Sequence, residues 1–137
     1  MSRDALIVGI NTYQRLPGLQ APAQDAEAVA HQLHTCGDFR VTRLPEVLTD
    51  RTDRADPQTK VGLKTPVTLR ELESALVRLF KPKGSNIPYT AVFYFSGHGL
   101  QKDAGIQEGY LATSDADPDQ GIYGLSLFWL RRLLQES

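Results

Sequence analysis

The hydrophobic residues of the chain form two kinds of pattern, which predict two kinds of element. Unbroken apolar runs at 5–10 and 90–95 predict strands buried on both faces, the second rich in aromatic and β-branched residues. A weaker run from 39 to about 48 predicts a further strand. The chain therefore has the apolar segments that a sheet covered on both sides requires.

Three other segments place apolar residues at the spacing of a helix. The first helix is expected to open at Asp25 and to stop at Gly37. The second opens at Thr68, where Glu71 three residues later completes a capping box. The third covers 125–134 and is strongly amphipathic. Strands that alternate with helices in this way predict an α/β fold with a mainly parallel sheet.

The remaining segments are expected to lie outside these elements. Two prolines and a glycine make 12–23 a loop, and a turn-rich stretch is expected at 115–121 after a short extended piece at 109–112. The segment 49–66 is predicted to be a long polar surface loop, of a kind that is usually functional or mobile. Its basic part, 51–64, is a candidate site for proteolytic processing.

Composition changes this picture little but excludes several classes of protein. The length of 137 residues suits a single domain at 1–137. Lys and Arg number 15 against 16 Asp and Glu, so there is no overall basic field for nucleic acid. No apolar run approaches the roughly 18 residues of a membrane span. The N-terminus lacks a secretion signal and Cys36 is the single cysteine, which together fit a reducing cytoplasm.

A histidine lies where an α/β fold is expected to place its functional site. Ligands bind beyond the carboxyl ends of the strands in open α/β sheets. The run 90–95 ends in Ser-Gly-His-Gly, which contains His98, and the first strand ends at Asn11. The flanking glycines permit unusual backbone conformations and leave the imidazole accessible. The alternative interpretation is a histidine in a glycine turn without a role.

Three short motifs follow one another along the chain. They are Gly-Ile-Asn-Thr-Tyr at 9–13, Asp25 in the first helix, and Phe-Tyr-Phe-Ser-Gly-His-Gly at 93–99. In this order, and from Ala5 to Leu134, the sequence resembles the caspase-like cysteine peptidases of the C14 clan, above all their metacaspase and bacterial branch. The resemblance implies a three-layer α/β/α caspase-like fold.

The resemblance also implies roles for three residues. His98 matches the catalytic histidine, the base and acid partner of a nucleophilic cysteine. Gly99 matches the residue whose backbone N–H helps to form the oxyanion hole. Asp25 matches an aspartate of the S1 pocket in metacaspases, which selects Arg or Lys; the alternative is a helix N-terminal acid that interacts with the helix dipole. The stretch 17–21 lacks the arginine with which caspases receive an aspartate, which favours basic specificity.

The chain also departs from the family pattern. The family's nucleophile is a cysteine on a fourth strand, which would follow the last helix, and the sequence stops at Ser137. Cys36 should lie at the opposite end of the sheet from His98 and is expected to be a small, partly buried thiol. We therefore expect an N-terminal, p20-like part of the domain, truncated before the nucleophile and inactive alone. Its expected partners are a peptide substrate and a complementary C-terminal segment that carries the cysteine.

No metal or other cofactor is expected. The paired acids that a calcium-dependent metacaspase needs before its last helix are absent from this sequence. The alternating acids at 115–119 lack the glycine and distal glutamate of an EF-hand loop. His31 and His34 have no third ligand nearby in sequence, which disfavours zinc.

Three functions remain open from the sequence. The first is part of a cysteine endopeptidase that uses a Cys–His dyad and cleaves after Arg or Lys. The second is a non-catalytic caspase-like module that binds a partner protein. The third is an unrelated hydrolase, for which Ser96 lies close to the histidine but outside any Gly-x-Ser-x-Gly nucleophile elbow. The first is favoured because 92–95 would otherwise form an uncovered apolar edge.

Overall fold

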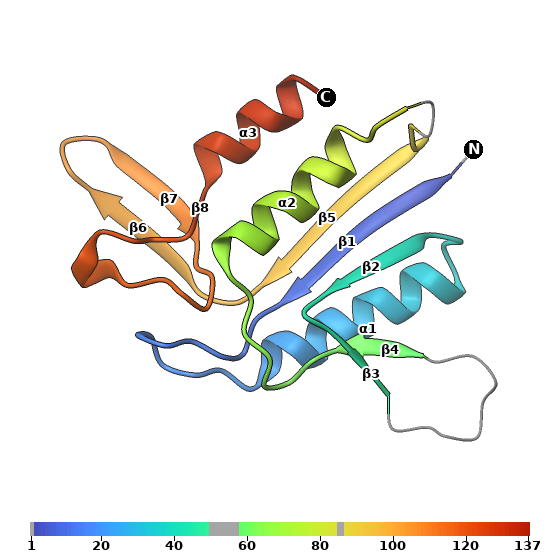
Figure 1. The fold of residues 1–137 in the computed structure, drawn as a ribbon, viewed down its shortest axis with the longest axis horizontal. Helices are drawn as coiled ribbons and strands as arrows, with labels where there is room; N and C mark the ends of the chain where they lie inside the picture. Colours follow the sequence, from blue (N-terminus) through green and yellow to red (C-terminus); the bar gives the residue numbers. More distant parts are fainter. Residues whose placement is uncertain (1, 50–57, 85–86) are drawn as a thin grey trace.

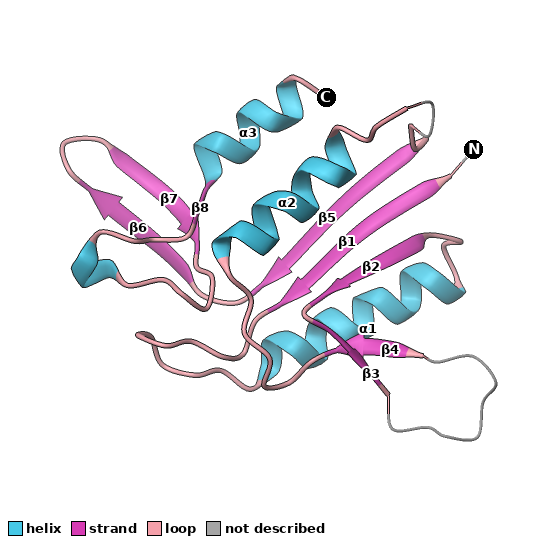
Figure 2. Cartoon of the chain, viewed as in Figure 1, coloured by secondary structure: helices cyan, strands magenta, loops and turns pink. Residues whose placement is uncertain are grey.

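The computed structural model describes residues 2–49, 58–84 and 87–137. At its centre, three parallel strands lie in the order β2-β1-β5. They are β1 (Arg3–Gly9), β2 (Arg40–Leu44) and β5 (Thr90–Ser96). Helix α1 (Ala21–Thr35) covers one face of this sheet, and α2 (Leu69–Phe80) and α3 (Leu127–Gln135) lie on the other (Figure 1, Figure 2). This is the three-layer α/β/α arrangement with a mainly parallel sheet that the sequence predicts.

Two antiparallel elements accompany the central sheet. Strands β3 (Glu46–Leu48) and β4 (Thr59–Val61) form a short pair beside α1. A second sheet contains β6 (Gly99–Asp103), β7 (Gln107–Leu111) and β8 (Leu125–Ser126), with a turn of 3₁₀-helix at Pro118–Gln120. Figure 1 shows this second sheet on the side toward which the parallel strands run, so it adjoins the loops that follow them.

Strand β1 divides the core into two layers because successive side chains point to opposite faces. Leu6 and Val8 pack with the large aliphatic side chains of α2, such as Leu76. Ala5 and Ile7 pack with the alanines of α1. The core residues on the α2 side are therefore larger, and those on the α1 side are small, which lets α1 lie close to the sheet.

The close approach of α1 requires a glycine at the end of β1. A Cβ on Gly9 would lie 2.5 Å from the Pro22 carbonyl oxygen and 2.7 Å from the Ala26 Cβ. Such contacts are shorter than van der Waals packing allows. Gly9 and the small residues of α1 together fix where this helix begins relative to the carboxyl end of β1.

The first helix begins earlier than the sequence predicts. It starts at Ala21, so Asp25 lies beyond its first turn, and part of the expected loop 12–23 is helical. Pro22 fits the first turn, where no intrahelical N–H is needed. The N-cap residue Gln20 makes no side-chain cap, and Asn11 supplies one instead, as described below. The prediction was wrong because this cap comes from outside the helix's own sequence.

The strand predictions are correct in place but wrong in extent. The run 39–48 is interrupted at Pro45, which has no N–H for a ladder, and becomes β2 and β3. The expected loop 49–66 contains β4, and the polar residues after His98 form β6. The residues Leu125–Ser126 form β8, and α3 starts only after Ser126. Pairing with a neighbouring strand of the same sheet stabilises these short strands in spite of their polar residues.

Other local predictions are confirmed. The capping box at the start of α2 is present, since Thr68 accepts from the Glu71 N–H at 3.2 Å and Glu71 accepts from the Thr68 N–H at 3.2 Å.

Part of the candidate processing segment 51–64 lies outside the described residues. Within the described residues, no helix has both the length and the apolar character needed to cross a bilayer.

Candidate active site

His98 lies in the turn between β5 and β6, at the carboxyl edge of the parallel sheet. This edge is shared with the end of β1, because the Ile10 N–H donates to the Ser96 carbonyl at 3.0 Å. The two polar strand ends singled out in the sequence, Asn11 and His98, are therefore brought to the same side of the sheet. Figure 1 shows the loop after β1 running beneath the start of the second sheet.

The imidazole of His98 has one hydrogen-bonded nitrogen. Its Nε2 lies 2.7 Å from the carbonyl oxygen of Pro17, in the loop between β1 and α1. A carbonyl oxygen only accepts hydrogen bonds, so this contact assigns the proton of a neutral ring to Nε2. Nδ1 then has a lone pair and is the nitrogen that can accept a proton. The half-buried ring is thus oriented and in the tautomer that a general base needs.

The side chain of Tyr13 lies against His98. The two rings are in an edge-to-face arrangement with centroids 4.7 Å apart and an interplanar angle of 69°. The Tyr13 Oη accepts from the His98 N–H at 2.9 Å and donates to the Ala112 carbonyl at 3.1 Å. Burial raises the pKa of Tyr13, an effect that the bond from the His98 N–H partly opposes, so the hydroxyl keeps its proton.

Gly99 begins β6, directly after the histidine. Its partner in β7 is Leu111, and the preceding pair is linked by a bond from the Ala112 N–H to the His98 carbonyl at 2.8 Å. Hydrogen-bonded and non-bonded pairs alternate along an antiparallel ladder. The Gly99 N–H therefore points away from β7, and this residue is exposed. A backbone donor that lies beside the imidazole and points away from its own ladder is what an oxyanion site requires.

Asn11 connects the end of β1 to the start of α1. Its Oδ1 accepts from the Ala23 N–H at 2.9 Å, and its Nδ2 donates to the Gln20 carbonyl at 3.4 Å. Its own carbonyl accepts from the Leu19 N–H at 2.9 Å. Asn11 is buried. Through these hydrogen bonds it joins the two ends of the loop that carries Tyr13 and Pro17.

A buried polar segment behind the histidine joins several loops. In the segment 112–115, Thr113 and Ser114 are fully buried. The Ser114 carbonyl accepts from the Gln14 N–H at 3.0 Å, and its Oγ accepts from the Val67 N–H at 2.8 Å. The sequence reasoning assigned no role to this segment or to Tyr13. The signal for the segment 112–115 was its small and hydroxyl side chains after an extended piece, and the signal for Tyr13 was its place in the motif at 9–13.

A comparison with family models found a match to the caspase domain of peptidase family C14 over residues 2–135. This covers nearly the whole chain. The chain belongs to the caspase family. A search of curated proteins found no match. The family membership agrees with the fold, and it makes the chain a member of a cysteine-peptidase family.

The caspase domain places Asp25 on α1. The helix begins next to the loop that carries Pro17, and Asp25 lies one turn further in with its side chain exposed. The alternative role of a first-turn acid is wrong, because the first turn of α1 contains no acidic residue. A role in substrate binding remains a prediction for this residue.

Cys36 lies at the end of the caspase domain opposite to His98. It is the C-cap of α1, and the neighbouring Gly37 carbonyl accepts from Arg3 at the start of β1, at 3.0 Å. The distal position agrees with the prediction. The thiol is exposed, however, so the expectation of partial burial was wrong. Cys36 is the C-cap and lies after Thr35, the last residue of α1.

Among the residues that the structure describes, no three His, Cys, Asp or Glu side chains of the caspase domain are placed to hold a metal ion together. Asp115 accepts hydrogen bonds from the Thr113 hydroxyl at 2.6 Å and from the Leu69 N–H at 3.2 Å. It is therefore occupied in fixing the start of α2.

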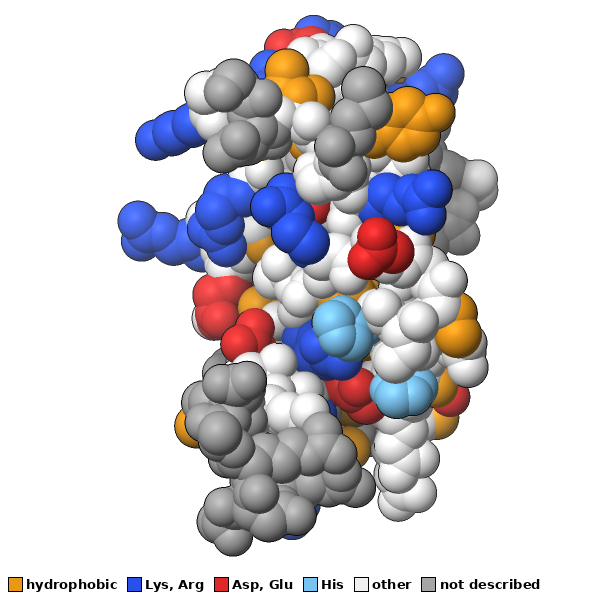
Figure 3. All heavy atoms as spheres, turned by 90° about the vertical axis from the view of Figure 1, so that its right-hand side faces the viewer, with side chains coloured by type: hydrophobic (Ala, Val, Ile, Leu, Met, Phe, Trp, Pro, Cys, Tyr) orange, Lys and Arg blue, Asp and Glu red, His pale blue; other side chains and the backbone are white. Residues whose placement is uncertain are grey.

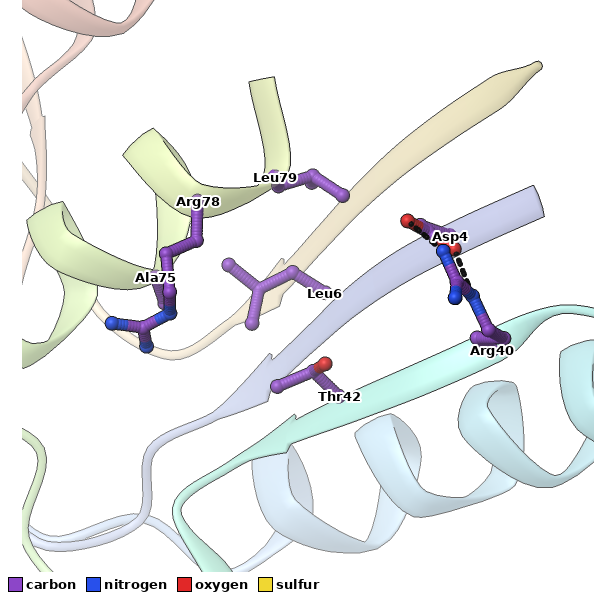
Figure 4. A pocket seen from close by; sticks show the side chains of 7 residues that line it. All are labelled: Asp4, Leu6, Arg40, Thr42, Ala75, Arg78 and Leu79. Atoms are coloured by element: carbon purple, nitrogen blue, oxygen red, sulfur yellow. Dashed lines mark hydrogen bonds and ion pairs between the residues drawn. The ribbon is translucent and has the colours of Figure 1, made fainter. Parts of the chain in front are cut away.

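A cavity of about 350 Å³ lies between α2 and strands β1 and β2, away from His98. Figure 4 shows Leu6 and Leu79 facing into it, and Arg40 paired with Asp4 at one end, at 2.7 Å. Figure 3 views the side of the molecule at the right of Figure 1, where Lys and Arg side chains lie among acidic ones. The cavity does not include His98, so the candidate active site remains the carboxyl edge of the sheet.

Proposed function

We propose that the chain supplies the histidine half of a caspase-like cysteine endopeptidase. The observation that carries the proposal is the His98 imidazole, half-buried at the carboxyl edge and held through Nε2 by the Pro17 carbonyl at 2.7 Å. The family match over residues 2–135 supports the same reaction class. The chain's single cysteine, Cys36, lies at the other end of the sheet, so the nucleophile would come from a complementary C-terminal segment or subunit.

In this mechanism His98 moves protons between the reacting groups. Its Nδ1 takes the proton of the nucleophilic thiol, and the thiolate attacks the peptide carbonyl carbon. The tetrahedral oxyanion accepts a hydrogen bond from the Gly99 N–H. The imidazolium then gives its proton to the leaving amine, and the acyl–sulfur bond is hydrolysed by a water that His98 deprotonates. No cofactor takes part.

We further propose that the enzyme cleaves after Arg or Lys. Asp25 is the candidate S1 residue, and its exposed carboxylate is free to meet a basic side chain once the pocket is completed. The domain would be a p20-like part, and the edge strand β5 is the natural place for the missing strand. All seven residues of β5 are only half-buried, which supports an apolar edge that needs cover.

A second candidate function is a caspase-like module that binds another protein without catalysis. The observation in its favour is the same edge: within the described residues β5 has a strand partner only on the β1 side. An extended segment of another protein could add to it by backbone pairing. The two candidates differ in whether a reactive cysteine reaches His98.

The test measures cleavage of fluorogenic peptides that carry Arg, Lys or Asp before the scissile bond. The chain alone should be inactive, and the chain joined to the complementary segment should cleave the Arg and Lys peptides. His98→Ala should abolish cleavage, whereas His31→Ala, an exposed residue of α1, should leave it unchanged. Asp25→Asn should lower the rate on basic peptides.

Two results would contradict the proposal. Cleavage by the 137-residue chain alone would show that no second segment is needed. Full activity of His98→Ala in the completed protein would remove the histidine from the mechanism. Complete lack of cleavage, with a segment that binds tightly to the chain, would favour the binding module.

A further inference from the structure

The ladder between β6 and β7 is interrupted at the catalytic position by a side chain. By continuation of the register, Ala112 lies opposite His98. At such a position two residues normally exchange both backbone bonds. One bond is present, from the Ala112 N–H to the His98 carbonyl at 2.8 Å. The other is replaced by the Tyr13 hydroxyl, which accepts from the His98 N–H at 2.9 Å and donates to the Ala112 carbonyl at 3.1 Å.

We propose that Tyr13 is a positioning residue for the catalytic histidine: its hydroxyl replaces one rung of the β6–β7 ladder, and its ring supports the imidazole. The inference rests on the proposed function of His98 as the proton carrier. Because the hydroxyl bridges two backbone groups in series, the His98 nitrogen stands further from the Ala112 carbonyl than a direct bond of about 2.9 Å would hold it. The His98 carbonyl keeps its direct bond to the Ala112 N–H, so the pair is opened on one side only.

The surroundings of Tyr13 leave room for its hydroxyl between His98 and Ala112. A Cβ on Gly97 would lie 2.5 Å from the Tyr13 Oη, so the glycine before the histidine gives the hydroxyl its room. The edge-to-face contact between the two rings restrains the imidazole, with centroids 4.7 Å apart. A phenol hydroxyl is ordinarily protonated at neutral pH, and burial raises the pKa of Tyr13 further, so the hydroxyl can act as both donor and acceptor.

One loop holds His98 by two independent contacts. The Pro17 carbonyl binds the imidazole Nε2. Tyr13, four residues earlier, accepts from the His98 backbone N–H through its hydroxyl and packs edge-to-face against the imidazole through its ring. The loop is itself fixed, by Asn11 at both ends and by the bond from the Gln14 N–H to the Ser114 carbonyl at 3.0 Å. The loop that follows β1 therefore fixes the position of both the ring and the backbone of the histidine. This is the arrangement that keeps an imidazole within the narrow geometry of proton transfer.

The first test compares Tyr13→Phe with Tyr110→Phe by ¹H–¹⁵N NMR of the labelled chain. Tyr110 is a matched control, because its hydroxyl donates to Glu108 at 2.6 Å and lies on the same sheet. Tyr13→Phe should lower the exchange protection of the His98 amide about tenfold and move its proton resonance upfield, as expected for a lost hydrogen bond. Tyr110→Phe should leave both unchanged. An unaltered His98 amide in Tyr13→Phe would overturn the proposal.

The second test separates the ring from the hydroxyl and positioning from general stability. Tyr13→Phe should keep the ring-current shift of the His98 ring protons, and Tyr13→Leu should lose it. In the completed peptidase, Tyr13→Phe should lower kcat about tenfold or more with KM within about twofold, since a small misplacement of a proton carrier affects the chemical step. Global unfolding of Tyr13→Phe, or unchanged kcat, would overturn the proposal. An NMR change without any peptidase activity in the wild type would instead refute only the proposed function.

Discussion

At the scale of single residues, the site depends on polar side chains that bind the backbone rather than a substrate. Asn11 caps a helix that begins ten residues later, and Tyr13 bridges the residue before β6 and the residue after β7. Both are placed at the end of β1, where the chain turns out of the sheet. The imidazole of His98 is oriented through these contacts, so substitutions that touch no reacting atom are expected to change the site.

Asn11→Ala should destabilise the fold by about 1–3 kcal/mol. The change removes the acceptor for the Ala23 N–H, which is buried and would have no other partner on the cap side. Urea unfolding followed by circular dichroism gives the free energy. Gln20→Ala is the matched control, because Gln20 is the N-cap by position but makes no side-chain cap. An equal or larger loss for Gln20→Ala would refute the assignment of the cap to Asn11.

His98 was accessible to sequence reasoning, and Tyr13 was not. A histidine between two glycines at the end of an apolar strand has a local signature, which needs no knowledge of distant residues. The bond from Tyr13 to Ala112 joins positions 99 apart, and no local pattern predicts it. The same applies to Asn11 as a cap for α1. Residues that serve other segments become visible only when those segments are placed.

At the scale of elements, the packing of α1 against β1 determines where the helix begins and therefore the extent of the loop that carries Tyr13 and Pro17. The alternation of strands with helices and the mainly parallel sheet followed from the hydrophobic pattern, because long periodic segments dominate it. The start of α1 and strand β6 did not follow, because a tertiary cap and a pairing partner determine them. The alanine-rich face of α1 allows close contact with β1, and Gly9 is the point of closest approach.

Gly9→Ala should destabilise the protein by about 1–3 kcal/mol or displace α1. The new Cβ would meet the Pro22 carbonyl oxygen at 2.5 Å and the Ala23 Cα at 2.9 Å, and backbone atoms cannot move aside cheaply. Gly18→Ala is the control, since its nearest contact would be 3.7 Å, and its stability should change by less than about 1 kcal/mol. Thermal unfolding of both variants measures the difference. Equal melting temperatures would contradict the close-packing argument.

At the scale of the whole molecule, the two layers of core contribute unequally. The layer under α2 contains the large side chains Leu72, Leu76 and Leu125, all of them nearly or fully buried. The layer under α1 is built mainly of alanines with Ile7 and Val61. Burial free energy scales with the apolar area removed from water. We therefore expect the larger share of the burial free energy on the α2 side, whereas α1 meets the sheet through small buried residues, with its larger hydrophobic side chains only partly buried.

Leu76→Ala should cost about 2–5 kcal/mol, because it leaves a cavity in the larger layer. Val77→Ala is the neighbouring control on the same helix. Its side chain is 40% exposed, so the expected loss is below about 1 kcal/mol. Chemical denaturation with matched slopes measures both. A cost for Leu76→Ala no greater than that for Val77→Ala would show that the α2 layer is not the dominant core.

The contacts around His98 also determine when the site can form during folding. Those that join Val67 to Ser114 and Tyr13 to His98 and Ala112 span 47, 85 and 99 positions. Closing long loops costs more chain entropy, and contacts of high sequence separation slow folding. On a ribosome that adds about 5–20 residues per second, Tyr13 waits about 5–20 s until Ala112 has been made. Throughout that interval the loop after β1 lacks its contacts with His98 and Ala112, so the support for the histidine can form only after Ala112 has been made.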